Sequence, residues 1–384
     1  MTRPFGWHHW LRRPTTWIIL VGLVISQLMT DGGSFHYYSH LDVSEAMLTL
    51  AAAAPAACMA AAWEAGSLRA FLERGTNHRT ILRALTRRLW ALPLLPLVCF
   101  VACVLTRGVA SSLTSSATPG LVAICLAHGI AWTILGAGLG LWLRGLFALP
   151  LALLIPYLLI VVPPALPTTT WRHLTGIPVF CCTNDSVLAP AMVGGSLLAV
   201  TSVGLVGAAI VALRTATPIT LGMAGALACM AIAGIIAAVP LTAGLDFSST
   251  SPRDSADLTC DADIHMCHWP DSTPEFISSN LQAREVYQRL SPAAQPRTEI
   301  SERPSRPDQL RATYGNNEAQ RVWEFLLQDL ARDPALSDAR LCGLPLADQA
   351  GLGYLPVLIP PLPAARLTAP DALALMEAHC PAQS

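Results

Sequence analysis

The chain has 384 residues, of which 53% are hydrophobic and 13% are charged, and its mean hydropathy is +0.48. Because soluble globular domains carry about 25% charged residues, this composition excludes an ordinary soluble protein and favours an integral membrane protein. The formal net charge of −1 gives no basis for nucleic-acid binding.

The acidic residues are unevenly distributed along the chain. Residues 1–250 contain seven Asp and Glu, whereas residues 251–384 contain the other eighteen together with eleven arginines. This split indicates that the first part meets lipid and the second part meets water. We therefore expect a transmembrane bundle over 1–243, a Ser- and Asp-rich linker over 244–263 and a soluble domain over 264–384.

Seven apolar segments are candidates to cross a bilayer, for which a helix needs about 20 residues. They cover residues 15–30, 47–63, 89–106, 120–143, 146–166, 190–213 and 219–243. Prolines interrupt several of them: Pro55, Pro93, Pro96, Pro150, Pro156, Pro163 and Pro164. Since backbone groups freed by proline in lipid must be satisfied by neighbouring helices, these prolines predict kinked helices packed in an all-α polytopic bundle.

The first span has an alternative interpretation. Its charged start and short apolar run are also typical of a secretory signal peptide. No Ala-x-Ala cleavage site directly follows Met29, so we expect an uncleaved span.

The placement of arginines predicts the orientation, because cytoplasmic loops of membrane proteins are enriched in basic residues. Alternate connections hold eleven of them: Arg3, Arg12, Arg13, Arg69, Arg74, Arg79, Arg83, Arg87, Arg88, Arg144 and Arg214. The opposite connections hold only Arg107 and Arg172. This bias predicts a multi-pass membrane protein with a cytoplasmic N-terminus and, after seven crossings, an extracytoplasmic C-terminal domain. All 24 basic residues are arginine, which together with the abundant Ala, Gly, Pro and Leu is typical of a high-GC bacterium, so we expect a bacterial plasma membrane.

The basic connection Trp63–Trp90 begins with Glu64 at the cytoplasmic mouth of the second span and ends in an amphipathic helix. One face of that helix is apolar and the other is basic: Ile81, Leu82, Leu85 and Leu89 against Arg83, Arg87 and Arg88. Two roles suit this pattern. The arginines can lie among anionic lipid head groups, or the helix can dock a soluble cytoplasmic partner.

Three features of residues 1–215 resemble the membrane subunits of type 2 ABC transporters, in particular an actinobacterial branch of permease-like proteins. They are an amphipathic elbow at Trp7–Arg13, the Trp63-Glu64-Ala65-Gly66 start with Arg79 opening the next helix, and a compact external segment at Thr168–Pro190. The resemblance implies that the connection after the second span couples to a separate ATP-binding subunit through Glu64, Arg69, Glu73 and Arg79. It also implies a homo- or heterodimer in the membrane.

The chain departs from that family in its last span. The family's core has six spans and a cytoplasmic C-terminus, whereas residues 219–243 add a crossing that carries the chain outward. The sequence contains no Gly-x-x-x-x-Gly-Lys-Ser/Thr motif and no lysine, so we expect ATP to be hydrolysed by a partner. No hydrolase motif is found either, and we expect neither an enzyme nor a cofactor.

The predicted spans contain almost no ionisable residue, and His128 is the clear case. We favour a hydrogen bond from His128 to a neighbouring helix over a proton relay. The lack of carboxylates argues against a proton- or sodium-coupled carrier. Gly136 and Gly140 have the spacing of a close helix–helix contact.

The cysteines fall into two groups. Cys58, Cys99, Cys103, Cys125 and Cys229 lie within predicted spans, whereas Cys181, Cys182, Cys260, Cys267, Cys342 and Cys380 lie on the predicted external side. An even number in an oxidising compartment predicts disulfides. Of the three pairings open to the four tail cysteines, we favour Cys260–Cys267 and Cys342–Cys380. The adjacent Cys181 and Cys182 do not readily bridge each other, so we expect one of them to pair elsewhere.

The C-terminal domain is predicted to be small, mainly helical and held by disulfides. Helical patterns cover 274–290, 317–332, 334–341 and 370–379, and 354–362 is expected to be extended. Cys260, His265, Cys267 and His268 match no common zinc-ligand spacing, so we expect no metal. A binding or interaction module is the expected role of this domain.

Two functions follow as expectations. The first is the membrane subunit of an ABC-type exporter or resistance system that moves a small amphipathic or peptide-like compound. The alternative is a non-transporting, membrane-anchored scaffold or sensor whose external domain binds an envelope component.

Overall fold

The computed structural model of the chain divides into two compact units, one formed by residues 1–34 and 40–251 and the other by 35–39 and 252–384. The residues described are 13–30, 39–73, 78–107, 110–166, 169–178, 181, 186–214, 218–245, 248–270, 272–291, 297–306, 308–313, 317–336, 338–342, 344–346, 360, 362–363, 366 and 368–380. The boundary at residue 252 lies inside the segment predicted as a linker.

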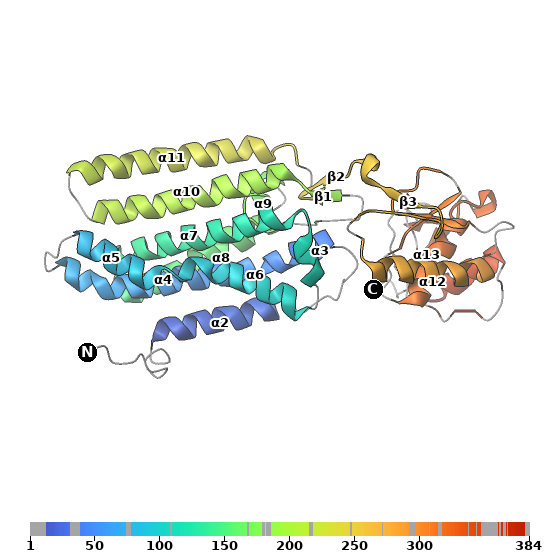
Figure 1. Cartoon of the computed structure of the whole chain (residues 1–384), viewed down its shortest axis with the longest axis horizontal. Coiled ribbons are helices and arrows are strands. Elements are labelled where there is room, and N and C mark those ends of the chain that lie inside the picture. The colour runs from blue at the N-terminus through green and yellow to red at the C-terminus, as the bar shows by residue number, and fades with distance from the viewer. Residues whose placement is uncertain are drawn as a thin grey trace. The chain divides into compact units, whose positions relative to one another are not determined.

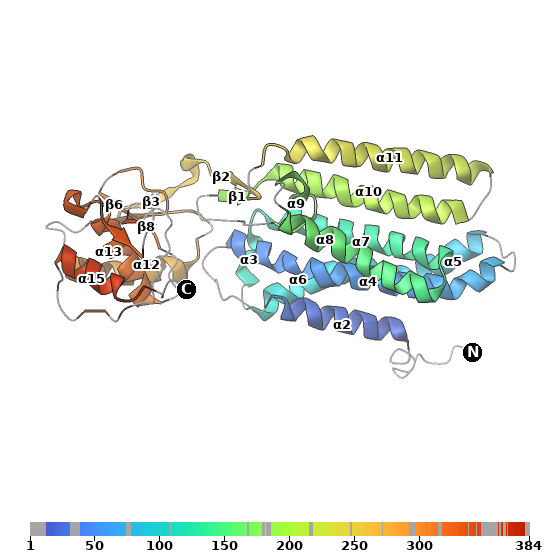
Figure 2. The same cartoon turned by 180° about the vertical axis from the view of Figure 1, so that it is seen from behind.

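The first unit is a bundle of long helices. Its helices are α2 (Pro14–Leu28), α3 (Ser39–Ala46), α4 (Leu50–Glu73), α5 (His78–Leu89), α6 (Leu95–Thr106), α7 (Thr118–Trp142), α8 (Gly145–Ala165), α9 (Thr169–Arg172), α10 (Pro190–Arg214) and α11 (Pro218–Thr242). Short 3₁₀ turns lie at Met47–Thr49, Leu92–Leu94 and Ala110–Thr114, and β1 (Ser186–Leu188) pairs with β2 (Thr250–Pro252). In Figures 1 and 2 the long helices run alongside one another, with α10 between α7 and α11.

Six helices of the described residues are long and apolar enough to cross a membrane: His40–Arg69, Leu82–Thr106, Thr118–Trp142, Gly145–Ala165, Pro190–Arg214 and Thr220–Thr242. This confirms a helical membrane bundle. The remaining predicted span, the first at 15–30, corresponds to α2, which is apolar but has only 15 residues.

Two predicted spans have different limits in the structure. The second extends from His40 to Arg69, because α3, a 3₁₀ turn and α4 follow one another without a break. The third begins at Leu82 and includes most of α5, which a turn at Trp90 and Ala91 and a 3₁₀ turn join to α6. Much of the basic connection Trp63–Trp90 is therefore the continuation of two spans.

Small residues bring α4 and α7 close together, as the glycine spacing predicted. A Cβ at Gly136 would lie 2.1 Å from the carbonyl oxygen of Cys58, and one at Gly140 would lie 2.2 Å from that of Ala62. Only hydrogen fits at these two positions. Membrane helices associate through such backbone contact because lipid supplies no hydrophobic drive for packing side chains.

The two units also differ in what they expose. The large hydrophobic side chains that are exposed all lie between Trp17 and Leu241, and among the described residues the second unit has none of them. The most exposed of these side chains include Leu146 of α8 at 80% and Ile236 of α11 at 66%. This distribution agrees with lipid around the first unit and water around the second.

The second unit combines a sheet with helices. Its strands are β3 (Thr259–Asp261), β4 (Met266–His268), β5 (Glu299–Ser301) and β6 (Gln309–Arg311), in that order; β3 and β4 are antiparallel, and the other neighbours are parallel. Its helices are α12 (Pro274–Leu290), α13 (Glu318–Leu330) and α15 (Ala369–Glu377), and β7 (Arg340–Leu341) pairs with β8 (Leu344–Pro345). Helix α13 is buried along most of its length and packs against α12 and β6.

The helices at 274–290, 317–332 and 370–379 were correctly predicted, whereas the sheet was not. The predicted helix 334–341 is wrong: a 3₁₀ turn at Pro334–Leu336 is followed by β7. Strands of two or three residues are too short to show alternation, so their pairing depends on contacts distant in sequence. Most of the predicted extended segment 354–362 lies outside the described residues.

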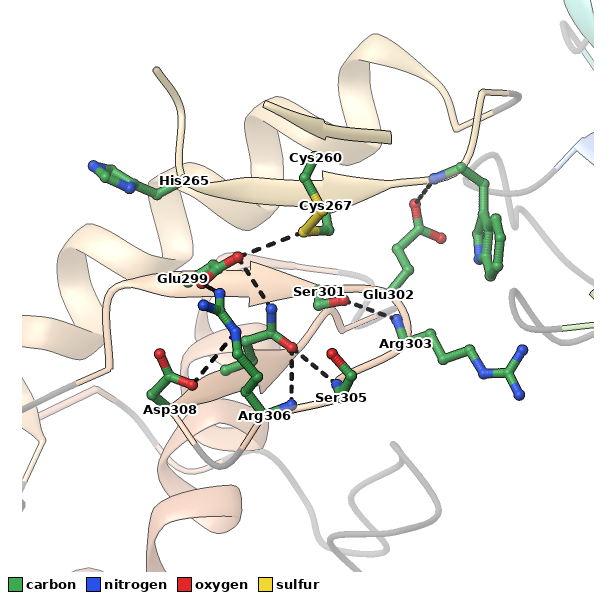
Figure 3. The surroundings of a disulfide bond; sticks show 12 residues. Cys260, His265, Cys267, Glu299, Ser301, Glu302, Arg303, Ser305, Arg306 and Asp308 are labelled. Atoms are coloured by element: carbon green, nitrogen blue, oxygen red, sulfur yellow. Dashed lines mark hydrogen bonds and ion pairs between the residues drawn. A yellow bond between two sulfur atoms is a disulfide. The ribbon is translucent and has the colours of Figure 1, made fainter. Parts of the chain in front are cut away.

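Both predicted tail disulfides are confirmed. Cys260 and Cys267 face each other across β3 and β4, and Cys342 is bonded to Cys380, which follows the end of α15. Cys181 is also disulfide-bonded, whereas Cys182 lies outside the described residues. Figure 3 shows Glu299 beside the Cys260–Cys267 bond, where it pairs with Arg306 and accepts a 3.0 Å hydrogen bond from Gln309.

Candidate functional site

The four residues predicted to couple to a partner lie at the end of the bundle that holds α5, but the structure divides them. Glu64 and Arg69 belong to α4 and have different neighbours. Glu73 is the last residue of α4 and Arg79 is the second residue of α5. The side chains of Glu73 and Arg79 lie outside the described part of the chain.

Glu64 is the centre of a polar cluster that joins three helices. Glu64 is 8% exposed, and its carboxylate accepts a 2.6 Å hydrogen bond from Thr15 of α2. Its other oxygen lies 3.4 Å from Nη1 of Arg88 on α5. The same Nη1 donates a 2.6 Å hydrogen bond to Ser67, one turn along α4. Glu64 therefore ties α2, α4 and α5 together.

Thr15, Ser67 and Arg88 were missed as members of this cluster. Arg88 was assigned to the basic face of an amphipathic helix, without a partner. A usable signal was present: Glu64 and Glu73 are the two acids of the Trp63–Trp90 connection, and Glu64 lies next to a predicted span. A carboxylate in that place requires a cation or a hydrogen-bond donor. The sequence alone gave no indication that α2 approaches this point.

Arg69 lies on another side of α4, at the rim of a second feature. Its Nη1 donates a 3.4 Å hydrogen bond to the carbonyl oxygen of Trp142 at the end of α7. Beside it is a groove of about 520 Å³ between α4, the end of α7 and the start of α8. Arg69 and Arg144 both line this groove, and none of the described residues that line it is acidic. Two guanidinium groups at an open groove suit a carboxylate-bearing partner.

Helix α5 has the predicted amphipathic character. Leu85 and Leu89 are 6% and 8% exposed and pack against apolar residues of α4 and α7. Arg83 and Arg87 are exposed. The apolar face packs α5 against the bundle, and these two arginines therefore point away from the bundle.

A second polar cluster at the opposite end of the bundle was not expected. Asp42 of α3 is 3% exposed and accepts a 2.9 Å hydrogen bond from Ser112, and Glu45 forms a 2.8 Å ion pair with Arg107. The prediction that His128 is the clear ionisable group of the bundle is therefore wrong. The second span was placed from residue 47, whereas its helical run begins near His40 and includes both carboxylates.

The environment of His128 also differs from the prediction. Its Nδ1 accepts a 2.9 Å hydrogen bond from Trp132, one turn along the same helix and not from a neighbouring one. Its Nε2 is buried without a hydrogen-bond partner in the described structure. Gly176, at a φ of +81°, lies against this ring: a Cβ there would be 2.5 Å from Nε2.

In the second unit, two of the four residues considered as zinc ligands are joined in a disulfide, Cys260 and Cys267. A disulfide sulfur has no thiolate to offer a metal. Figure 3 shows His265 pointing away from this bond. Among the described residues, no group of three or more His, Cys, Asp or Glu is placed to hold a metal ion.

No family model, no curated protein and no solved structure matches the chain. We therefore infer its function from its own residues and their contacts.

Proposed function

We propose that the chain is the membrane subunit of an ABC-type exporter or resistance system in a bacterial plasma membrane. It works with a separate ATP-binding subunit, as one half of a homo- or heterodimer, and moves a small amphipathic or peptide-like compound. The observation that carries this proposal is the Glu64 cluster, which links α2, α4 and α5 at the arginine-rich end of the bundle.

The cluster suits the transmission of force from a soluble partner. A partner that engages Arg69 and Arg144 at their groove pushes on the end of α4, and α4 packs against α2, α7 and α8. Because Glu64 binds α2 and α5 to the same helix, these three helices move as one body. ATP-driven motion at one end is thereby passed along the bundle.

The proposed orientation has the N-terminus in the cytoplasm, seven crossings that include α2, and the second unit outside. The eleven-to-two distribution of arginines supports it. The Cys260–Cys267 and Cys342–Cys380 disulfides support it independently, since disulfides form and persist in oxidising compartments.

A second candidate is a non-transporting scaffold or sensor whose external domain binds an envelope component. The observation in its favour is that the second unit has a core of its own, built around Trp323, Phe325 and Tyr287. A module with its own core can bind a partner without any motion of the bundle. The two proposals differ in whether an ATP-binding subunit is required.

Affinity purification of the full chain from its native membrane tests the first proposal. We expect an ATP-binding subunit to co-purify and its ATPase rate to depend on this chain. Arg69→Glu should lower both association and ATPase stimulation about tenfold, because it places a like charge opposite a carboxylate partner. Arg13→Glu, which changes an exposed arginine before α2, is the matched control. If no ATP-binding subunit associates, or if both variants behave as wild type, the transporter proposal fails.

A further inference from the structure

A lateral groove runs along the bundle between α5, α7, α10 and α11. Its volume is about 540 Å³, which lies within the range of about 300–1,000 Å³ typical of small-molecule sites. Its lining is almost wholly apolar and includes Leu85 and Leu89 of α5, Ile134 of α7 and Leu227 of α11. Among the described residues, none that lines it is charged. The groove therefore suits a hydrocarbon chain.

The rim of the groove is exposed. Leu82, Trp90, Ile130 and Met223 all line it, and their exposed fractions are 48%, 69%, 50% and 51%. These residues belong to segments that are long and apolar enough to cross a membrane or that join two such helices. In a bilayer this opening faces lipid, so that a lipid chain enters it from the side.

Helix α5 also carries positive charge at positions next to groove-lining residues. Leu82, Thr86 and Leu89 of this helix line the groove, and Arg83 and Arg87 each follow a lining residue by one position. Both arginines are exposed, and neither has an ion-pair partner among the described residues. Basic residues at a membrane surface attract anionic lipid head groups.

One polar side chain lies inside the groove without a partner. Thr133 of α7 lines it and is 4% exposed, and its hydroxyl makes no hydrogen bond in the described structure. A buried hydroxyl normally finds a partner. The ester oxygens of a phospholipid can accept a hydrogen bond from this hydroxyl.

We propose that this groove is a binding site for an anionic phospholipid, with an acyl chain between α7 and α11 and the phosphate at Arg83 and Arg87. The arginines favour this occupant over an uncharged apolar compound. They also disfavour a second copy of the chain, since a symmetric contact through this face brings the arginines of the two copies toward each other. The site is independent of Glu64 and Arg69, on which the proposed transport function rests.

Photolabelling tests this proposal on the full chain in lipid nanodiscs made of equal parts phosphatidylglycerol and phosphatidylcholine. The probe is a phosphatidylglycerol that carries a diazirine on one acyl chain. We expect the label on the peptides that contain Ile130 or Met223, and we expect unlabelled phosphatidylglycerol to compete better than phosphatidylcholine. Arg83→Gln and Arg87→Gln should each reduce labelling about fivefold, the effect of one basic residue at an anionic surface.

Two further variants complete the test. Arg13→Gln removes an exposed arginine outside the groove and should leave labelling unchanged. Ala208→Phe fills the groove without altering any charge and should abolish labelling. Equal competition by the two lipids, or an equal effect of Arg13→Gln and Arg83→Gln, overturns the proposal. So does disulfide crosslinking of two copies through Met223→Cys, which shows that a second copy covers the groove. If the wild-type chain is not labelled but an ATP-binding subunit still co-purifies with it, the lipid site is rejected and the transport proposal is unaffected.

Discussion

At the scale of single residues, Glu64 shows how a carboxylate is kept at the end of an apolar helix. Burial of a charge is costly unless it is paired and hydrogen-bonded. Thr15 and Arg88 together meet that requirement, and each comes from a different helix. A change at this one residue therefore affects the contacts of α2, α4 and α5.

We expect Glu64→Ala to lower the free energy of unfolding by about 2 kcal/mol, because Thr15 and Arg88 both lose their acceptor. The larger cost of breaking a fully buried ion pair is not expected, since the Arg88 side chain is 42% exposed. Unfolding of the purified protein in mixed micelles measures the effect. Arg87→Ala, on the exposed face of α5, should change stability by less than about 0.5 kcal/mol. Equal effects of the two variants would contradict the role of the cluster.

In the second unit, Asp329 holds a comparable position. It accepts hydrogen bonds of 2.6 Å from both Tyr287 and Ser291 and forms a 2.6 Å ion pair with Arg297. Burial, together with the Asp329 carboxylate, raises the pKa of Tyr287 from 10.0 to about 12. The folded domain thus holds the phenol proton more tightly than the unfolded chain does.

The pH dependence of stability follows from this raised pKa. The contribution of Tyr287 is fully present below the unfolded pKa of 10.0 and is lost as the pH rises toward about 12. We expect the free energy of unfolding of the second unit to fall by about 2 kcal/mol over that interval. Tyr287→Phe should remove this part of the dependence. Urea denaturation at several pH values, monitored by circular dichroism, measures this dependence. If the free energy of unfolding of Tyr287→Phe falls with pH as steeply as that of the wild type, another group titrates.

At the scale of elements, the contact of α4 with α7 depends on the absence of side chains. The Ala-rich run of α4 is only mildly apolar, and its small residues allow close packing: Ala53, Ala54, Ala57, Ala60 and Ala61 are fully buried. The glycines of α7 lie against its backbone. The high alanine content lowers the hydropathy of this span, and it also allows α4 to pack closely in the middle of the bundle.

Gly136→Ala should destabilise the bundle by about 2 kcal/mol, since the added methyl group overlaps the backbone of Cys58 and the two helices must separate. Gly225→Ala in α11 is the control: no atom lies within 4 Å of its Cβ position, and replacement of glycine in a helix stabilises by up to about 1 kcal/mol. Thermal unfolding in detergent compares the two. Equal melting temperatures would mean that α4 and α7 are not packed so closely.

At the scale of the whole molecule, the two units are built for different solvents. The first presents large apolar side chains outward, and the second has a buried apolar core without exposed large hydrophobic residues among those described. The uneven distribution of acids along the chain anticipates this difference. The proposal also places the second unit outside the cytoplasm, and fusion proteins test this placement.

We expect an alkaline phosphatase fusion at Leu245 to be active, because phosphatase folds only outside the cytoplasm, and a fusion at Gly145 to be inactive. These positions follow the seventh and fourth predicted crossings. A fluorescent protein that folds in the cytoplasm should give the reverse pattern at the same two sites. A silent phosphatase at Leu245 would reject seven crossings, and α2 would then be the first span to reconsider.

The sequence alone determined the class of the molecule and much of its local structure. Long apolar runs required helices, because lipid offers no partner for a free backbone group, and the helices α12, α13 and α15 followed from helical periodicity. Both tail disulfides were also correctly paired. These features depend on residues close in sequence or on composition over a whole segment.

Only the tertiary structure decided which distant residues meet. The pairing of Glu64 with Thr15 spans 49 positions, and that of Asp42 with Ser112 spans 70. The sheet of the second unit likewise joins strands too short to be recognised singly. Such contacts form only when the helices have packed, so no local sequence pattern predicts them.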